Sequence, residues 1–385
     1  MTARIAWFDR DSQQIKNFAS AVSIHSHTSR SRESLEFVQR TFDNHPVLRR
    51  FLSKRAGEAQ RSGIPLDLKR GYWTPPLCPR SAYEVEKNQI EQKLGLRAMV
   101  SLSDHDCIAA PMLLQMVPAL QTPISLEWTV PFQRAKFHLG VHNLPAAEAH
   151  RWLAELQACT AEPSTGRVCD LLRTLNALPG ILVVFNHPLW NLYGLPVAEF
   201  QQQLEDFLAL NNGVLHAFEL NGLRRWEENA RTIALARRWQ QIVISGGDRH
   251  GAEPNANLNL TNASCFDEWV REIRVERRSH LLFMPQYNDP LEARCYQTFL
   301  DAIRYYPEHS DGACQWDQRT FHPGGDGQVH PLSDLWRRVP PFLQIILGVA
   351  RLAESTPLLS TVRHYGARPV DRLPGLTGNG EAACD

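Results

Sequence analysis

Short hydrophobic runs alternate with longer amphipathic stretches along most of the chain. The runs, which predict β-strands, are Ala21–Thr28, Ala98–Ser103, Ile124–Val130, Phe137–Val141, Ile181–Asn186, His216–Asn221 and Ile242–Gly247. The stretches with helical periodicity are Tyr83–Leu94, Ala146–Leu156, Val168–Leu178, Val197–Leu210 and Trp226–Trp239. This alternation predicts an α/β fold with a mainly parallel sheet, and seven strands favour a closed or nearly closed barrel over a small open sheet.

Two regions depart from this alternation. Residues 36–82 hold a basic, helix-like part and then a proline-rich loop, and they are too long for an ordinary connection after the first strand. They are therefore interpreted as an insertion. Beyond about residue 262 the pattern becomes mostly helical and ends in a tail rich in Gly and Pro, with helices expected at 267–280, 290–306 and 333–354. We expect a barrel at 1–265 and a helical C-terminal extension at 266–385.

The composition narrows the possible functions. Among 385 residues, 41 basic side chains balance 41 acidic ones, so nucleic-acid binding is not expected. The first residues are charged where a signal peptide would be apolar, and the longest apolar run, Pro341–Ala350, is too short to span a membrane. Eight cysteines without a CxxC pair indicate reduced thiols. These features predict a cytoplasmic protein.

Acids and histidines fall at or near the ends of the predicted strands. His25 and His27 are two apart and share one face of a strand, and Asp248 and His250 repeat this spacing. Because the carboxyl ends of parallel strands meet at one face of a barrel, we expect them to converge with side chains from the other strands. Those are Asp104, His105, Asp106, Glu127, His138, His187 and Glu219.

Imidazoles mixed with carboxylates suit Zn²⁺, Mn²⁺ or Fe²⁺, and their number exceeds what one ion uses, so two or three divalent ions are expected. Each residue alone has an ordinary explanation: the sequence SDHD (103–106) is typical of a helix N-cap, His187 of a turn, and Glu219 can pair with an arginine. Seven strand ends that each carry an acid or a histidine favour a metal site. By contrast, the loop His309–His330 lacks regular ligand spacing, and His142 is interpreted as structural.

Four blocks of sequence resemble the PHP family, named for polymerase and histidinol phosphatase domains. The blocks are IHSHT (24–28), LSDHD (102–106), FNHP (185–188) and SGGDRHG (245–251). The resemblance implies a distorted (β/α)7 barrel and a metal-dependent phosphoesterase. It implies that His25, His27, Glu127 and Asp248 hold one ion, that Glu127, His138 and His187 hold a second, and that His105 and His250 serve a third or contact the phosphate.

The chain departs from the family pattern in two places. Ser23 stands where an acid usually begins the first block, and the stretch SRSRES (29–34) follows where an acid or histidine usually supports a third ion. Two ions are therefore expected more firmly than three. Arg30 or Arg32 is predicted to contact the substrate phosphate instead, because a guanidinium matches phosphate oxygens.

The expected reaction is hydrolysis of a small phosphorylated metabolite or nucleotide by a hydroxide that bridges two ions. In this scheme His105 stabilises charge on the phosphoryl oxygens, while His250, or Asp104 through a water, protonates the leaving oxygen. Two alternatives remain open from the sequence: hydrolysis of a different bond, such as an amide, and a non-catalytic metal-binding protein.

Overall fold

The structure is a computed structural model. It describes residues 2–36, 69–117, 122–192, 194–307 and 312–335, together with residues 120, 309, 339, 344, 345, 347, 348 and 352. The basic part of the predicted insertion, most of the predicted helix at 333–354 and the Gly/Pro-rich tail lie outside these ranges.

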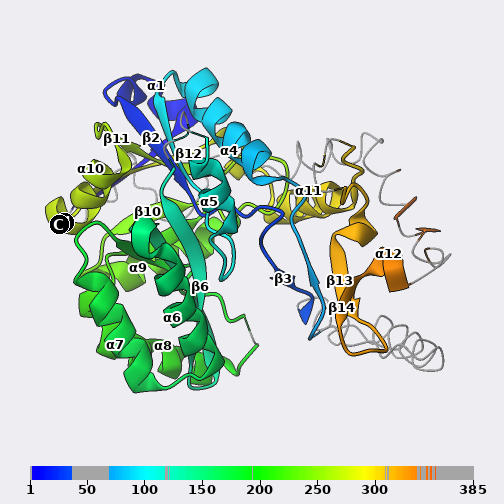
Figure 1. The fold of residues 1–385 in the computed structure, drawn as a ribbon. Helices are drawn as coiled ribbons and strands as arrows, with labels where there is room; N and C mark the ends of the chain where they lie inside the picture. Colours follow the sequence, from blue (N-terminus) through cyan, green and yellow to red (C-terminus); the bar gives the residue numbers. More distant parts are fainter. Residues whose placement is uncertain are drawn as a thin grey trace.

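The chain folds as a mixed α/β protein (Figure 1), and each of the seven predicted strands is present. The first five-stranded sheet has the order β1-β12-β11-β2-β5, with β1 (Thr2–Trp7), β12 (Arg278–Phe283), β11 (Asn257–Thr261), β2 (Ser20–Ile24) and β5 (Arg97–Ser101). The second has the order β10-β9-β8-β7-β6, with β10 (Val243–Gly246), β9 (Ala217–Asn221), β8 (Leu182–Asn186), β7 (Ala135–Leu144) and β6 (Ile124–Phe132).

The expectation of a mainly parallel sheet is wrong. In the two sheets, the pairs β1–β12, β2–β5, β8–β9 and β9–β10 are parallel, whereas β6–β7, β7–β8, β2–β11 and β11–β12 are antiparallel. The reason is visible between β6 and β7, where Phe132 pairs with Ala135 across a two-residue turn. Such a turn forces an antiparallel hairpin, because a parallel crossover needs a dozen or more residues.

The two sheets meet at the carboxyl ends of their strands. Among the described residues no continuous ladder joins them, but two isolated bridges do, Ser26 with Arg249 and His105 with Glu127. The first bridge links the segments that follow β2 and β10, and the second links the segment after β5 to β6. Hydrogen bonding thus does not close a barrel, but it brings the ligand-bearing ends of both sheets together.

Helices cover the outer faces of the sheets. Figure 1 shows α6, α7, α8 and α9 grouped against β6–β10, with α1 and α4 at the opposite end of the body. The helices are α1 (Phe8–Ile15), α4 (Pro79–Asn88), α5 (Ala109–Gln115), α6 (Ala149–Ala161), α7 (Thr165–Asn176), α8 (Val197–Asn211), α9 (Trp226–Arg238), α10 (Phe266–Arg271), α11 (Leu291–Ile303) and α12 (Leu332–Leu335). The main hydrophobic core is rich in aromatic side chains, which include Trp7, Trp128 and Phe185.

A third, smaller sheet lies beside the main body, next to α11 (Figure 1). It has the order β14-β13-β4-β3, with β14 (Val329–Pro331), β13 (Thr320–Pro323), β4 (Tyr72–Trp73) and β3 (Glu33–Ser34). Segments far apart in sequence therefore pair here. The proposed division at residue 265 stays a prediction, but β12 and β13 both lie beyond it, and β12 is an interior strand of the first sheet.

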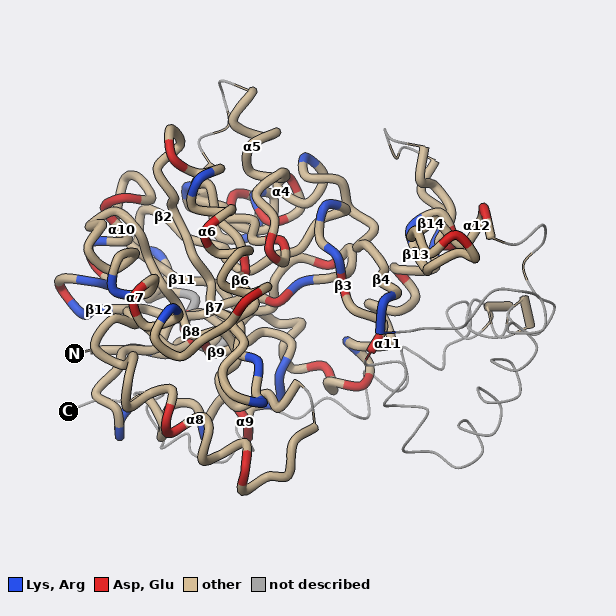
Figure 2. Tube along the Cα trace, turned by 60° about the horizontal axis from the view of Figure 1, so that its bottom comes forward, with Lys and Arg blue, Asp and Glu red and all other residues tan. Residues whose placement is uncertain are grey.

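Charged positions of both signs are interspersed along the chain, as Figure 2 shows. This distribution agrees with the equal numbers of basic and acidic residues. In the part of the chain that the structure describes, the helices are all too short or too polar to cross a membrane.

Candidate metal centre

Three of the predicted ligands sit on an unusual backbone. His25, His187 and Asp248 have φ angles of 61°, 28° and 56°, in the left-handed region that residues other than glycine seldom adopt. Each lies directly after a strand or in the next loop, and the backbone N–H of Asp248 donates to the carbonyl of His25 at 2.7 Å. Strained backbone of this kind persists where the surrounding structure holds it, which is typical of functional sites.

Glu127 on β6 is the centre of the cluster. Its carboxylate is buried, and both oxygens face imidazole nitrogens. Oε2 lies 3.1 Å from His25, 3.3 Å from His27 and 3.3 Å from His105, and Oε1 lies 3.3 Å from His138 and 3.1 Å from His187. A carboxylate with ligand atoms gathered at both oxygens is suited to bridge two cations.

Four overlapping groups of side chains have ligand atoms within 4.8 Å of one another. They are His25, His27 and Asp248; His25, Glu127 and His187; His105, Glu127 and His138; and His27, Glu33, His105 and His250. The structure thus brings together eight of the nine predicted metal ligands, from segments more than 200 positions apart. Their roles as ligands stay predictions.

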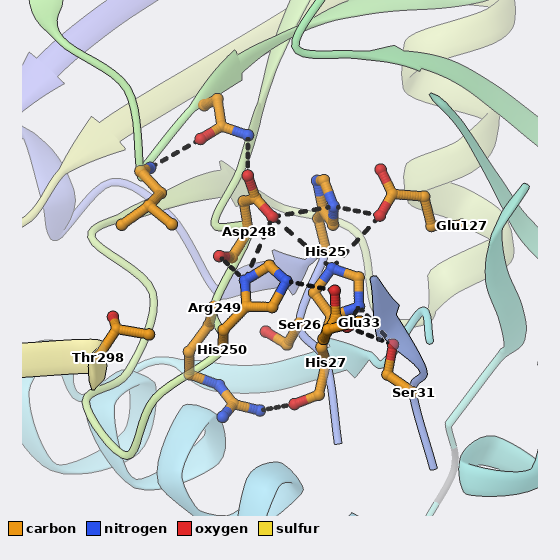
Figure 3. A network of polar contacts seen from close by, with 12 residues as sticks. His25, Ser26, His27, Ser31, Glu33, Glu127, Asp248, Arg249, His250 and Thr298 are labelled. Atoms are coloured by element: carbon orange, nitrogen blue, oxygen red, sulfur yellow. Dashed lines mark hydrogen bonds and ion pairs between the residues drawn. The ribbon is translucent and has the colours of Figure 1, made fainter. Parts of the chain in front are cut away.

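Glu33 is a candidate ligand that the sequence analysis missed. Its carboxylate on β3 lies 3.1 Å from Nε2 of His250, 3.3 Å from Nε2 of His105 and 3.6 Å from Nδ1 of His27. Ser31 fixes it by donating to Oε1 at 2.5 Å (Figure 3). Glu33 therefore supplies the carboxylate in the group that also contains His27, His105 and His250.

The signal for Glu33 was present in the sequence. It lies within the stretch SRSRES (29–34), whose two arginines favour an interpretation based on basic side chains. Successive side chains of an extended segment point to opposite sides. Arg32 is therefore exposed, while Glu33 is buried and faces the cluster. The premise that this stretch contributes no acid to the cluster is therefore wrong.

Glu219 was predicted as a metal ligand, but it lies outside the four groups. Its Oε1 is 2.7 Å from Nδ1 of His25, and its Oε2 accepts the backbone N–H of His187 at 3.0 Å. A carboxylate at Nδ1 keeps the proton on that nitrogen and leaves Nε2 free to bind a cation. Asn221 supports the same arrangement by donating to Asp248 at 3.2 Å. Glu219 thus orients ligands.

Asp104, predicted to act as a proton donor, also lies outside the groups. Both its oxygens are occupied, since Oδ1 accepts the N–H of Thr28 at 2.6 Å and Oδ2 accepts its hydroxyl at 2.8 Å. The side chain is fully buried. This geometry indicates that Asp104 holds the turn after the first ligand pair, and it gives no support to a part in proton transfer.

The acids and histidines of the cluster shift one another's pKa values. Burial alone would raise the pKa of Glu127, but the surrounding histidines hold it well below its usual range. Burial alone would lower the pKa of His105, yet Glu33 and Glu127 raise it to about 10. Glu33 and Glu127 therefore stabilise positive charge on His105. A divalent cation bound between these carboxylates would neutralise them in the same way.

The two histidines at Oε1 of Glu127, His138 and His187, have lowered pKa values, in contrast to His105. Burial lowers the pKa of His138 to about 4, against the opposing effect of Glu127, and burial also lowers the pKa of His187. Both rings are therefore neutral near pH 7. Neutral imidazole is the form that binds metal ions.

Arg224 lies at the edge of the cluster and was not predicted. Its guanidinium stacks over Trp190 at 4.2 Å from the ring centroid. Its Nη2 is 3.7 Å from Asp248, and its Nε is 3.5 Å from Glu228. The side chain is 14% exposed, so it is held in place yet reachable from solvent.

The other candidates lie apart from the four groups. Arg30 and Arg32 are exposed, and Arg32 stacks over Tyr72 at 5.2 Å. His142 bonds Ser101 at 2.9 Å, in line with a structural role. In the described part of the loop His309–His330, no residue joins a group of ligand atoms.

Comparisons with known proteins give weak likenesses. No protein family matches the sequence, and no curated protein does. A protein provisionally assigned as a metal-dependent phosphoesterase from Bifidobacterium adolescentis is 18% identical, with a TM-score of 0.32 over 52% of this chain and 91% of that one. An amidohydrolase from Chromobacterium violaceum, solved with sulfate and without metal, is 15% identical, with a TM-score of 0.31 over 46% of this chain and 83% of that one.

Proposed function

We propose that the protein is a metal-dependent phosphoesterase of the PHP type that hydrolyses a small phosphorylated molecule. The observation that supports this most is the Glu127 carboxylate, which has histidine nitrogens 3.1–3.3 Å from each of its two oxygens. The proposal includes a distorted barrel of the seven predicted strands. The two bridges, Ser26 with Arg249 and His105 with Glu127, lie at the seams where that barrel would close.

In this proposal the cluster holds three divalent ions of the Zn²⁺, Mn²⁺ or Fe²⁺ class. The first would be held by His25, His27, Glu127 and Asp248, the second by Glu127, His138 and His187, and the third by Glu33, His105 and His250. Such ions would supply a water of lowered pKa near neutral pH and would neutralise charge on phosphoryl oxygens. Mixed imidazole and carboxylate ligands fit this class of ion better than Mg²⁺ or Ca²⁺.

The side chains around the cluster fit this use. Glu219 fixes the orientation of His25, so that one ligand nitrogen faces the site without a proton. The His250 Nδ1 lies 2.9 Å from the carbonyl oxygen of Asp248, which leaves Nε2 directed at Glu33. Arg224 offers a planar cation at the edge of the site, where it can bind phosphate oxygens in a bidentate manner.

The test combines elemental analysis with an assay of phosphate release from a panel of phosphomonoesters and phosphodiesters. We expect bound divalent metal and turnover in the wild-type chain. Glu127→Gln removes the bridging charge and keeps the size, so it should lower turnover by more than about 100-fold, since even the partners of metal ligands are worth about 10–100-fold. Glu155→Gln, an exposed glutamine substitution on α6, is the control and should change neither property.

Three results would contradict the proposal. Full turnover in Glu127→Gln would remove the central carboxylate from the reaction. Bound metal without release of phosphate from any ester would favour a metal-binding protein without this activity. Hydrolysis of amides but not of phosphate esters, in a parallel panel, would assign the same site to a different bond.

A further inference from the structure

Between the ligands Asp248 and His250 stands an arginine that points away from them. Arg249 is 5% exposed, and Figure 3 shows its side chain leaving the cluster toward the backbone of His27. Its Nη2 donates to the carbonyl of His27 at 2.9 Å, and its Nη1 donates to the carbonyl of Gly251 at 2.7 Å. One guanidinium therefore joins the segment after β2 to the segment after β10.

The partner of Arg249 is a buried carboxylate on α4. Glu86 is fully buried, and its Oε1 accepts the Nε of Arg249 at 2.9 Å. The same carboxylate accepts the hydroxyl of Ser23 at 2.9 Å, the hydroxyl of Ser26 at 3.2 Å and the N–H of Asn255 at 3.1 Å. It therefore receives hydrogen bonds from both ligand-bearing segments.

We infer that the Glu86–Arg249 pair positions these two segments, 23–27 and 248–255, so that the cations that need ligands from both can bind. The inference rests on the proposed metal centre. Two of the four groups span both segments: His25, His27 and Asp248, and His27, Glu33, His105 and His250. The group of His105, Glu127 and His138 uses neither segment. We therefore expect the pair to affect ions bound by the first two of these groups and not an ion bound by His105, Glu127 and His138.

This role is separable from ordinary stability. A buried ion pair is often replaceable by apolar groups without loss of stability, so its presence is weak evidence for a stabilising role alone. Here the hydrogen bonds of the pair end on backbone or side-chain groups of the two ligand-bearing segments, 23–27 and 248–255. A change of a few tenths of an ångström between the segments would alter the spacing of His27 and His250, whose rings stack at 4.3 Å.

The test measures bound metal per folded chain in the full-length protein, by elemental analysis after gel filtration, and the affinity for Zn²⁺ by competition with a chelator. The variants are Arg249→Met and Glu86→Gln, with Arg249→Lys as a milder change that keeps the charge. Arg319→Met is the matched control, because Arg319 is equally buried and donates to four backbone carbonyls outside the cluster.

We expect Arg249→Met and Glu86→Gln to hold at least one ion fewer than the wild-type chain while retaining one, and we expect Arg249→Lys to bind the affected ion about 10–100-fold more weakly. Arg319→Met should unfold at a lower temperature and keep every ion. Wild-type stoichiometry and affinity in all three test variants would overturn the inference, as would equal metal loss in Arg319→Met. If the first two variants do not fold, Arg249→Lys decides between these results. A wild-type chain without any bound metal would instead overturn the proposed function.

Discussion

The guanidinium of Arg224 is held from three sides at the edge of the ligand cluster. Trp190 lies beneath its plane, Asp248 lies 3.7 Å from Nη2, and Glu228 approaches Nε at 3.5 Å. A planar cation fixed in this way loses little freedom when it binds a phosphate, because its position is already set. Arg32, in contrast, is exposed and contacts the ring of Tyr72.

We therefore predict that Arg224→Gln raises KM for the phosphorylated substrate by about 10-fold or more. Hydrogen bonds to charged groups contribute about 1.5–3 kcal/mol, and about 1.4 kcal/mol corresponds to a factor of ten. Arg32→Ala is the comparison and should have the smaller effect on KM. Steady-state kinetics of both variants check this, and a large effect of Arg32→Ala with none of Arg224→Gln would return the phosphate contact to Arg32.

At the scale of elements, the neighbouring strands β9 and β10 lie close together at Glu219, the residue of β9 that orients His25. Gly246 pairs with Asn221, and a Cβ atom at position 246 would lie 2.0 Å from Oε1 of Glu219. Glu219 cannot move aside without losing its contacts with His25 and His187. The lack of a side chain at residue 246 is thus what allows the carboxylate to stand there.

Gly246→Ala should therefore weaken both the fold and the metal centre. We expect the free energy of unfolding to fall by about 1–3 kcal/mol, as for other overpacked cores, and metal affinity to fall because His25 loses its fixed orientation. Urea denaturation and chelator competition measure the two effects. Gly166→Ala on α7 is the control, since no atom lies within 4 Å of the added Cβ, and a similar loss there would contradict the prediction.

At the scale of the whole molecule, the C-terminal part of the chain returns to complete structures begun near the N-terminus. β12 pairs with β1 along six residues, and Trp7 stacks on Phe283 at 4.8 Å. β13 pairs with β4, which pairs with β3, the strand that carries Glu33. The core of the first sheet and one candidate ligand thus depend on residues beyond 265.

Two truncations test this dependence. A chain that ends at residue 265 lacks β12 and leaves β1 without its partner strand, so we expect it not to fold. A chain that ends at residue 304 keeps both large sheets and α11 but lacks β13 and β14, so it should fold and hold one ion fewer than the full chain. Circular dichroism and elemental analysis measure these outcomes. A folded 1–265 chain, or full metal binding by the 1–304 chain, would contradict them.

The sequence by itself determined most elements of the two large sheets and most of the cluster. Apolar runs located seven of the ten strands in these sheets but missed β1, β11 and β12. Side chains on the predicted strands or just after them identified a set that the structure brings together: His25, His27, Glu127, His138, His187 and Asp248. These predictions succeed because strand periodicity and the position of a polar residue at a strand end are local properties.

Only the tertiary structure decided how these parts are used. The direction of β7 follows from pairing across the turn after Phe132, and the division of labour between Glu219, which orients His25, and Glu33, which faces three imidazoles, depends on distances between separate strands. The same holds for Asp104, whose oxygens are taken by Thr28. An acid's chemistry is set by what lies within about 3 Å of its oxygens, and residues far apart in sequence make those contacts.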